Sequence, residues 1–359
     1  MQPTLPSPTL LKAQAGAAGT GYAGRMTEVD ALRGVAAMAV VLFHYTTRLS
    51  ELFPGAGTAS FSLPDGHYGV NLFFVISGFV IFMTLERTTR PRDFWLSRLS
   101  RLFPSYWVAI AATFTICHVL GLPGKLVGPG TAVANMAMVH GLFGVAHVDG
   151  VYWTLEVEML FYCGMFALYR LHWMRHIHWF LCALMMLRLV HFALQKGAGF
   201  GLPWTVYRLL ILQYLPWFSL GIGVFLAVHR TQNTQRCARA GAAAMSVLAI
   251  ATLWICESAT VAMLAVTFAT AVYLAATSRL AFLRAVPLVW LGTISYPLYL
   301  LHENIGWALQ LRLASLHVPM DLALALALSA SLLLAHSCTR WVERPAMRWA
   351  RNWRNRDVR

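Results

Sequence analysis

Three ionisable residues share one face of the first long apolar stretch of the chain. Asp30, Arg33 and His44 lie in the run Asp-Ala-Leu-Arg-Gly-Val-Ala-Ala-Met-Ala-Val-Val-Leu-Phe-His. On an α-helix, Arg33 and His44 are separated by three turns plus about 20°, so their side chains point the same way, roughly 16 Å apart along the axis. Asp30 precedes Arg33 by one turn and can pair with it. Because ionisable groups are costly inside a bilayer, this polar stripe predicts a site facing the interior of a helix bundle.

The imidazole of His44 is the side chain in this stripe that takes up a proton near neutral pH. We therefore expect His44 to act either as a general base or as a relay that carries the transferred group. The alternative is an ion pair of Asp30 and Arg33 that anchors the helix at the membrane interface, with His44 hydrogen-bonded to a neighbouring helix.

The composition predicts an integral membrane protein. Of the 359 residues, 58% are hydrophobic and only 12% are charged, and the mean hydropathy is +0.60. A soluble domain carries about a quarter charged residues. The basic residues that give the net charge of +14 lie in short clusters between apolar stretches. This distribution follows the positive-inside rule, so we expect a lipid environment and no nucleic-acid partner. The six cysteines form no Cys-x-x-Cys pair, so no metal site is expected.

Ten apolar stretches are long enough to cross a bilayer as helices, which predicts an all-α, polytopic protein. Placing both termini in the cytoplasm puts most lysine and arginine residues on the inner side. The shorter segment 131–146 is too polar to span, and we expect an interfacial or re-entrant piece there. The ten stretches are 30–50, 69–86, 102–121, 151–170, 177–195, 205–228, 240–256, 259–277, 286–306 and 321–341.

The chain divides into one membrane domain and two short ends. Residues 1–25 are rich in Pro, Ala, Gly and Thr and lack an apolar run of signal-peptide type, so we expect a disordered tail. Residues 26–346 hold every apolar stretch and show no internal repeat, which predicts a single domain. Residues 347–359 are expected to be a basic cytoplasmic tail.

Arg98 and Arg101 lie three residues apart where the chain enters the third apolar stretch. Two guanidinium groups on one helical face can hold phosphate groups through paired hydrogen bonds. Ordinary positive-inside anchoring is the alternative explanation for the same charges.

Two later stretches carry further candidates. Glu156 and Glu158 are about 200° apart around a helix and cannot both face one cavity. We expect Glu158 to face the interior, because it lies deeper and Tyr162 follows one turn later on the same face. In the ninth stretch, Pro297 is expected to kink the helix or to leave a backbone carbonyl free. His302 follows five residues later and is either part of the site or a histidine with a structural hydrogen-bonding role.

The depths of these residues predict two polar regions. Counting about 1.5 Å per residue, His44, Ser77, Glu158 and His302 fall in the outer half of the bilayer. The three arginines Arg33, Arg98 and Arg101 gather at the inner surface. The alternative to a place in the site for Ser77 is a structural role, because Ser77 and the glycine after it are small and allow close helix packing. The sequence thus predicts a polar chamber that opens outward and a basic mouth that opens inward.

Together these stretches resemble the acyltransferase-3 family of bacterial integral-membrane O-acyltransferases. No single motif is decisive, but six occur in the family's order over residues 30–345. They are Asp30-Ala-Leu-Arg33-Gly with His44, Gly69-Val-Asn-Leu-Phe-Phe-Val-Ile-Ser-Gly-Phe, Arg98-Leu-Ser-Arg101-Leu-Phe-Pro104, Trp153-Thr-Leu-Glu-Val-Glu158, Ser295-Tyr296-Pro-Leu-Tyr299-Leu-Leu-His302, and Trp341-Val-Glu343-Arg-Pro345.

The resemblance implies a bacterial cytoplasmic-membrane enzyme with ten spans that uses cytoplasmic acyl-CoA, by the family's habit acetyl-CoA. Its acceptor would be a hydroxyl of a sugar or related molecule, such as a surface or exported polysaccharide. Asn71 stands where relatives often carry an acidic residue, which argues against a charge-dependent role there. The residues implied are His44, Glu158 and Asp30 in catalysis, Arg33, Arg98 and Arg101 at the coenzyme phosphates, and Ser77, Asn71, Trp153, Tyr296 and His302 at the substrate.

Two other functions fit the same pattern. In a transporter or flippase, the stripe would be a proton relay. Transporters tend to show inverted repeats and paired broken helices, whereas Pro297 has no counterpart in another half of the chain. The third possibility is a family member that has lost catalysis and acts as a sensor or scaffold.

Overall fold

The computed structural model describes residues 26–229 and 236–356, and every regular element in these ranges is a helix. The all-α prediction is therefore confirmed, while the predicted tail 1–25 lies outside the described residues. Seven described helical segments are long and apolar enough to cross a membrane: Thr27–Leu52, Pro64–Glu86, Pro91–Leu120, Gly150–Arg170, Met174–Ala198, Ala259–Ala276 and Met320–Arg356. Three shorter apolar helices are Leu215–Val228, Ala240–Cys256 and Val286–Leu301.

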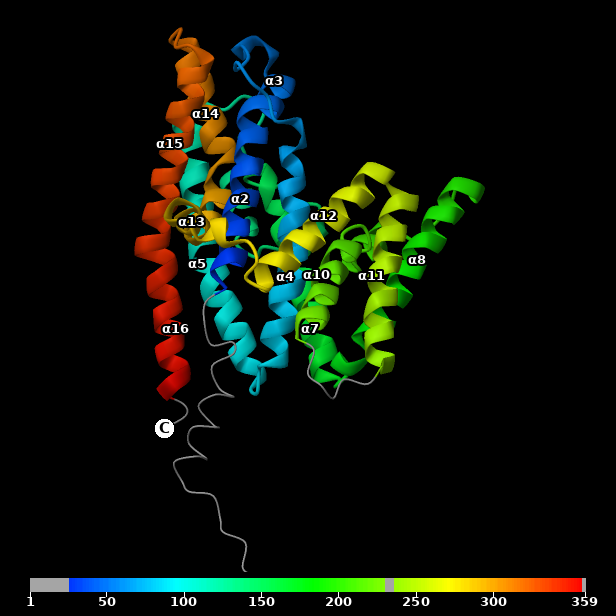
Figure 1. The fold of residues 1–359 in the computed structure, drawn as a ribbon. Coiled ribbons are helices and arrows are strands. Elements are labelled where there is room, and N and C mark those ends of the chain that lie inside the picture. Colours follow the sequence, from blue (N-terminus) through cyan, green and yellow to red (C-terminus); the bar gives the residue numbers. More distant parts are fainter. Residues whose placement is uncertain (1–25, 230–235, 357–359) are drawn as a thin grey trace, which may run out of the picture.

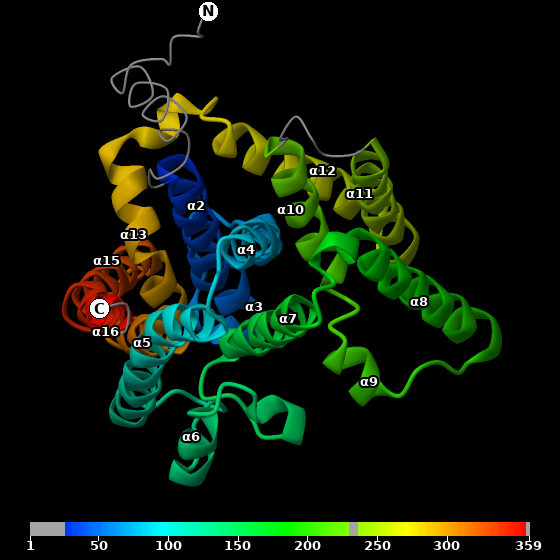
Figure 2. The same ribbon diagram turned by 90° about the horizontal axis from the view of Figure 1, so that it is seen from below.

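Two groups of helices stand side by side (Figure 1). In one, α2 packs on α13 and α4, and α4 also contacts α7 (Figure 2). The other contains α8, α10, α11 and α12, and joins the first where α10 packs on α4. The bounds are α2 (Thr27–Phe43), α3 (Leu49–Leu52), α4 (Gly69–Glu86), α5 (Pro91–Leu120), α6 (Pro129–Asn135), α7 (Trp153–Arg170), α8 (Ile177–Ala198), α9 (Trp204–Leu209), α10 (Leu215–Val228), α11 (Arg236–Cys256), α12 (Ala259–Ala276), α13 (Val286–Leu301), α14 (Glu303–Ser315), α15 (Met320–Cys338) and α16 (Arg344–Arg356).

Glycines bring the central helices into close contact. A Cβ atom added to Gly34 of α2 would lie 2.5 Å from the backbone nitrogen of Gly292 in α13. Gly78 of α4 similarly faces the backbone of Phe218 in α10. Only a residue without a side chain permits this approach of two helix backbones. These contacts hold α2 and α4 at the centre of the protein.

Two predicted spans are broken. The expected helix 205–228 is interrupted between α9 and α10, because Ile211 adopts a left-handed backbone with φ of +46°, which a β-branched residue rarely does. The expected helix 286–306 breaks at His302, between α13 and α14. Pro297 lies inside α13, so the helix break comes five residues after the proline.

The remaining differences lie in a loop and at the C-terminal end. Segment 131–146 contains part of the seven-residue α6 and a short 3₁₀ turn, so it holds no spanning helix, as the sequence predicted. Residues 344–356, most of which were expected in a tail, form α16. This helix continues α15 through a π-helical turn, Thr339–Glu343, as one long column (Figure 1).

Candidate active site

His44 lies where α2 changes from an α-helix into a π-helical turn, His44–Arg48. Such turns are rare and often occur at functional sites. The Nδ1 atom of His44 is 2.9 Å from the carbonyl oxygen of Val40. A carbonyl only accepts hydrogen bonds, so Nδ1 carries the proton and donates it to Val40. This leaves Nε2 with its lone pair, as a general base requires.

His302 lies directly behind this imidazole. Its Nε2 atom is 3.2 Å from Nδ1 of His44, and its own Nδ1 is 2.9 Å from the carbonyl of Tyr299, to which it donates. The hydroxyl of Tyr45 donates to the backbone oxygen of His302, which also accepts the backbone N–H of Gly306. His302 is fully buried. It therefore supports His44, which fits the structural alternative rather than the expected contact with substrate.

The carboxylate beside His44 belongs to Glu303, which the sequence analysis missed. Its Oε2 atom is 3.6 Å from Nε2 of His44. Glu303 also hydrogen-bonds to the buried carboxyl of Asp149, which accepts the backbone N–H of Asn304 at 3.1 Å. Burial raises the pKa of Asp149 to about 6. Two carboxyl groups in direct contact cannot both ionise readily, so the pair retains a proton.

A cavity of about 450 Å³, here called the His44 chamber, lies in front of Nε2. The predicted residues Asn71 and Trp153 line it, as do Glu303 and Lys125. Among the residues that the structure describes, no group of three or more His, Cys, Asp or Glu side chains is suited to hold a metal ion.

Glu158 lies in a different cavity from His44. The hydroxyls of Ser77 and Tyr162 both donate to its Oε1 atom, at 2.8 and 2.5 Å. Arg33 and Tyr296 line the same small cavity, of about 50 Å³, here called the Glu158 cavity. Glu158 thus faces the interior, as expected. It lies with the arginines, however, whereas the carboxyl group beside His44 is that of Glu303.

Asp30 is also remote from the imidazole. It lies near the start of α2, about 21 Å along the helix from His44, and its charge acts on Arg33. The expected pairing of Asp30 with Arg33 therefore fits the structure, whereas a direct catalytic role for Asp30 does not.

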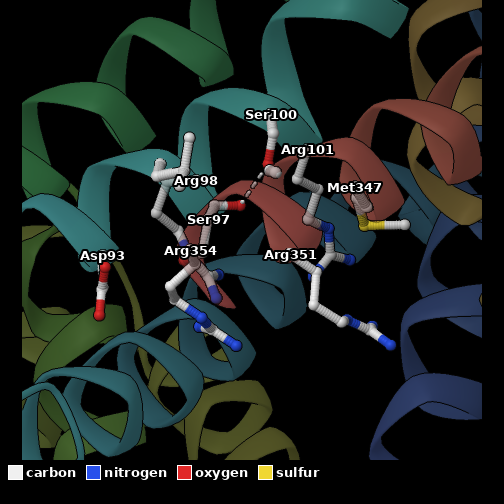
Figure 3. A pocket seen from close by; sticks show the side chains of 10 residues that line it. Asp93, Ser97, Arg98, Ser100, Arg101, Met347, Arg351 and Arg354 are labelled. Atoms are coloured by element: carbon white, nitrogen blue, oxygen red, sulfur yellow. Dashed lines mark hydrogen bonds between the residues drawn. The ribbon is translucent and has the colours of Figure 1, made fainter. Parts of the chain in front are cut away.

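The three predicted arginines come together. Arg98 hydrogen-bonds to Tyr162, and both Arg33 and Arg98 lie close enough to Arg101 for their charges to interact. The Nε atom of Arg101 is 4.0 Å from the carboxylate of Glu343. Arg98 and Arg101 also line a cavity of about 210 Å³, here called the arginine cavity, whose opposite wall is α16 (Figure 3). Its lining residues are Asp93, Leu96, Ser97, Arg98, Ser100, Arg101, Met347, Ala350, Arg351 and Arg354.

The His44 chamber and the Glu158 cavity share a wall. Val70, Phe74 and Tyr299 line both. The Glu158 cavity is connected in turn to the arginine cavity by hydrogen bonds, since Tyr162 contacts both Glu158 and Arg98. These shared lining residues and hydrogen bonds connect the arginines to the His44 chamber, a connection here called the polar path.

Comparisons with known proteins find one family model and several curated relatives. A family model for an acyltransferase domain matches residues 26–339. The chain is 31% identical to nodulation protein 10 of Rhizobium leguminosarum bv. viciae over 157 residues, which is 39% of this chain and 43% of the relative. It is 31% identical to the exopolysaccharide production protein ExoZ of Rhizobium meliloti over 129 residues, 31% of this chain and 37% of the relative.

A third relative is the peptidoglycan O-acetyltransferase OatA of Listeria monocytogenes, 25% identical over 169 residues, 41% of this chain and 25% of the relative. The chain thus spans less than half the length of each of these three relatives. No solved structure matches the chain significantly.

Proposed function

This chain belongs to the acyltransferase-3 family, and from that premise we propose that it transfers an acetyl group from cytoplasmic acetyl-CoA to a sugar hydroxyl of a surface or exported polysaccharide. The observation that carries the proposal is the free Nε2 atom of His44, which faces a chamber beside Glu303. The names of ExoZ and OatA, which refer to exopolysaccharide and to peptidoglycan, support this class of acceptor.

His44 acts as the base in the proposed reaction. Its Nε2 atom takes the proton of the acceptor hydroxyl while the hydroxyl oxygen attacks the thioester carbonyl. The carbon–sulfur bond then breaks, and the imidazolium returns the proton to the leaving thiolate. The pair of Glu303 and Asp149 retains one proton and therefore carries one negative charge, and the Oε2 atom of Glu303 lies 3.6 Å from Nε2, where this charge stabilises the imidazolium. An acyl-histidine intermediate would use the same nitrogen, so direct and two-step transfer share this geometry.

Arg33, Arg98 and Arg101 bind the phosphate groups of the donor in this proposal, because guanidinium forks match phosphate oxygens. The extended pantetheine arm then follows the polar path to the His44 chamber. The wall of Val70, Phe74 and Tyr299 must move aside for the thioester to reach Nε2. Side-chain rotation is fast compared with turnover.

We place the protein in the bacterial cytoplasmic membrane with both termini in the cytoplasm. The seven long helices and the three shorter apolar ones would together supply ten spans. In this arrangement the arginine cavity faces the cytoplasm, where acetyl-CoA is found, and the His44 chamber lies toward the outside.

The test is to incubate the purified protein in detergent with [14C]acetyl-CoA and with polysaccharide isolated from a strain lacking the gene. Transfer of label to the polysaccharide, or its slow release to water, is expected. Complete retention of label on CoA would overturn the proposal and favour a transporter or a sensor. The matched control is His44→Ala, which removes the base and leaves the arginines in place.

A further inference from the structure

Helix α16 has two opposite faces. Trp349 and Trp353 are exposed on one face, and their stacked rings have centroids 6.0 Å apart. Paired exposed Trp side chains are typical of a membrane interface. Around the helix, Arg351 lies about half a turn and Arg354 about a third of a turn from the direction of the two Trp side chains, and both arginines line the arginine cavity with Arg98 and Arg101 (Figure 3). The helix thus exposes its two Trp rings on the outer surface of the protein and directs the two arginines toward the arginine cavity.

The arginine cavity contains far more positive than negative charge. Four guanidinium groups line it, against the one carboxylate of Asp93. Arg101 has Glu343 as a partner at 4.0 Å, but no hydrogen-bond or ion-pair partner is found for Arg351 or Arg354 in the part of the chain that the structure describes. Arg98 and Arg101 lie close enough for their like charges to interact, and the exposed Arg351 and Arg354 add two more positive charges to the lining. This excess of positive charge favours an anion with several charges as the ligand of the cavity.

A second observation points to a ligand. The Nε atom of Arg98 is buried and has no hydrogen-bond partner within the described residues. Leaving a buried donor of a charged group unsatisfied costs free energy of folding. An acceptor oxygen supplied by a ligand in the adjoining cavity would remove that cost.

We propose that α16 forms one wall of the donor site, where Arg351 and Arg354 bind the adenosine 3′-phosphate end of CoA opposite Arg98 and Arg101. This inference rests on the proposed function. The diphosphate and the 3′-phosphate of CoA together carry about four negative charges at neutral pH, because the second pKa of a phosphate monoester is near 6. Four arginines match that charge. The family model ends at residue 339, so these two arginines lie outside the segment that it matches.

The position of α16 is coupled to the rest of the site. The π-helical turn that joins it to α15 carries Glu343, the partner of Arg101. Along its length α16 also packs on α5, the helix that carries Arg98 and Arg101. The two walls of the cavity are therefore held in a fixed relation, as a site for a rigid ring with phosphates requires.

The first test measures binding without turnover. Adenosine 3′,5′-bisphosphate is titrated calorimetrically into the purified full-length protein, as wild type, as the double variant Arg351→Gln/Arg354→Gln, and as Arg348→Gln. Arg348 is exposed on the same helix but does not line the cavity, so it controls for loss of charge. We expect the double variant to bind at least about 10-fold more weakly than wild type, and Arg348→Gln to stay within about 2-fold. Equal affinities of the double variant and Arg348→Gln would overturn the inference.

The second test compares donors. The KM for acetyl-CoA should rise about 10-fold in the double variant with little change in kcat, whereas the KM for acetyl-dephospho-CoA, which lacks the 3′-phosphate, should change much less. Lipid headgroups are the other source of phosphate, so both assays are run in nanodiscs with and without anionic lipid. An effect of the substitutions that appears only with anionic lipid would assign the arginines to lipid and overturn the donor assignment.

The two tests separate this inference from the proposed function. Binding of the bisphosphate that depends on Arg351 and Arg354, without any acetyl transfer, would reject the acetyltransferase and keep the nucleotide site. Acetyl transfer that is indifferent to both residues would keep the enzyme and reject the role of α16.

Discussion

The His44 chamber and the arginine cavity differ in how their charged groups are balanced. At the chamber, Glu303 lies beside His44 and hydrogen-bonds to Asp149, and His302 contacts His44 from the other side. At the arginine cavity, guanidinium groups outnumber carboxylates, and one buried nitrogen lacks a partner. The first region is complete for proton transfer, whereas the second requires a ligand to neutralise it. This difference suggests that chemistry belongs to the first region and donor binding to the second.

The largest expected effect separates the regions most clearly. Replacing His44 by alanine removes the base but leaves the arginines untouched, so kcat should fall by about 10²–10⁴-fold while the donor Kd stays near the wild-type value. Initial rates of acetyl transfer and donor titrations check this. An unchanged elution profile in detergent is the folding control, and a variant with more than a tenth of wild-type activity would contradict the assignment.

Two carboxylates allow a matched pair of variants. Glu303→Gln should lower kcat by about 10–100-fold, because it removes the carboxyl group that places the negative charge of the pair with Asp149 beside His44. Glu158→Gln, in the other cavity, should change donor KM more than kcat. Steady-state kinetics of the two proteins measure both quantities. The reverse pattern would make Glu158, and not Glu303, the functional partner of His44.

The arginines should affect binding rather than turnover. Arg98→Ala and Arg101→Ala are expected to raise the donor KM about 10-fold each, with a smaller fall in kcat, because each removes a charged hydrogen bond of about 1.5–3 kcal/mol. The acceptor KM serves as the internal control. An unchanged donor KM in the double variant would move the coenzyme site elsewhere.

The smallest effect concerns stability at the chamber. Burial raises the pKa of Asp149 from 3.8 to about 6, so the folded protein holds this proton more tightly than the unfolded chain does. The contribution of Asp149 to the free energy of unfolding is therefore full below about pH 4 and is lost as the pH rises toward 6. Over this range the free energy of unfolding should fall by up to about 1.4 kcal/mol per pH unit. Melting temperatures across this range should fall in wild type relative to Asp149→Asn, and parallel curves would show that Asp149 does not hold the proton.

The sequence predicted those parts of the site that depend on local periodicity. Arg33 and His44 belong to one helix, and Arg98 and Arg101 to another, so composition and spacing sufficed to place them. Glu303 was missed because it becomes a partner of His44 only through the helix break at His302. The nearby proline gave the stronger signal for a kink.

Other features depend on contacts between distant segments. The approach of Asp149 to Glu303 joins residues far apart in the chain, and no local pattern indicates it. The left-handed backbone of Ile211 is equally unexpected for a β-branched residue. In α16 the information was present, because the spacing of Trp349 and Trp353 against Arg351 and Arg354 is that of a helix with two faces. The high charge of this segment nevertheless favoured the interpretation as a tail.

The central claim is that a donor held by the arginines delivers its acyl group to His44 at the other end of the polar path. The most direct measurement uses sealed proteoliposomes of defined orientation, with [14C]acetyl-CoA supplied on the α16 side only and polysaccharide on the opposite side only. The account predicts labelled polysaccharide with wild type, none with His44→Ala, and none when the donor is supplied on the chamber side alone. Labelling only when donor and acceptor share a compartment, or equal labelling from either side, would contradict it.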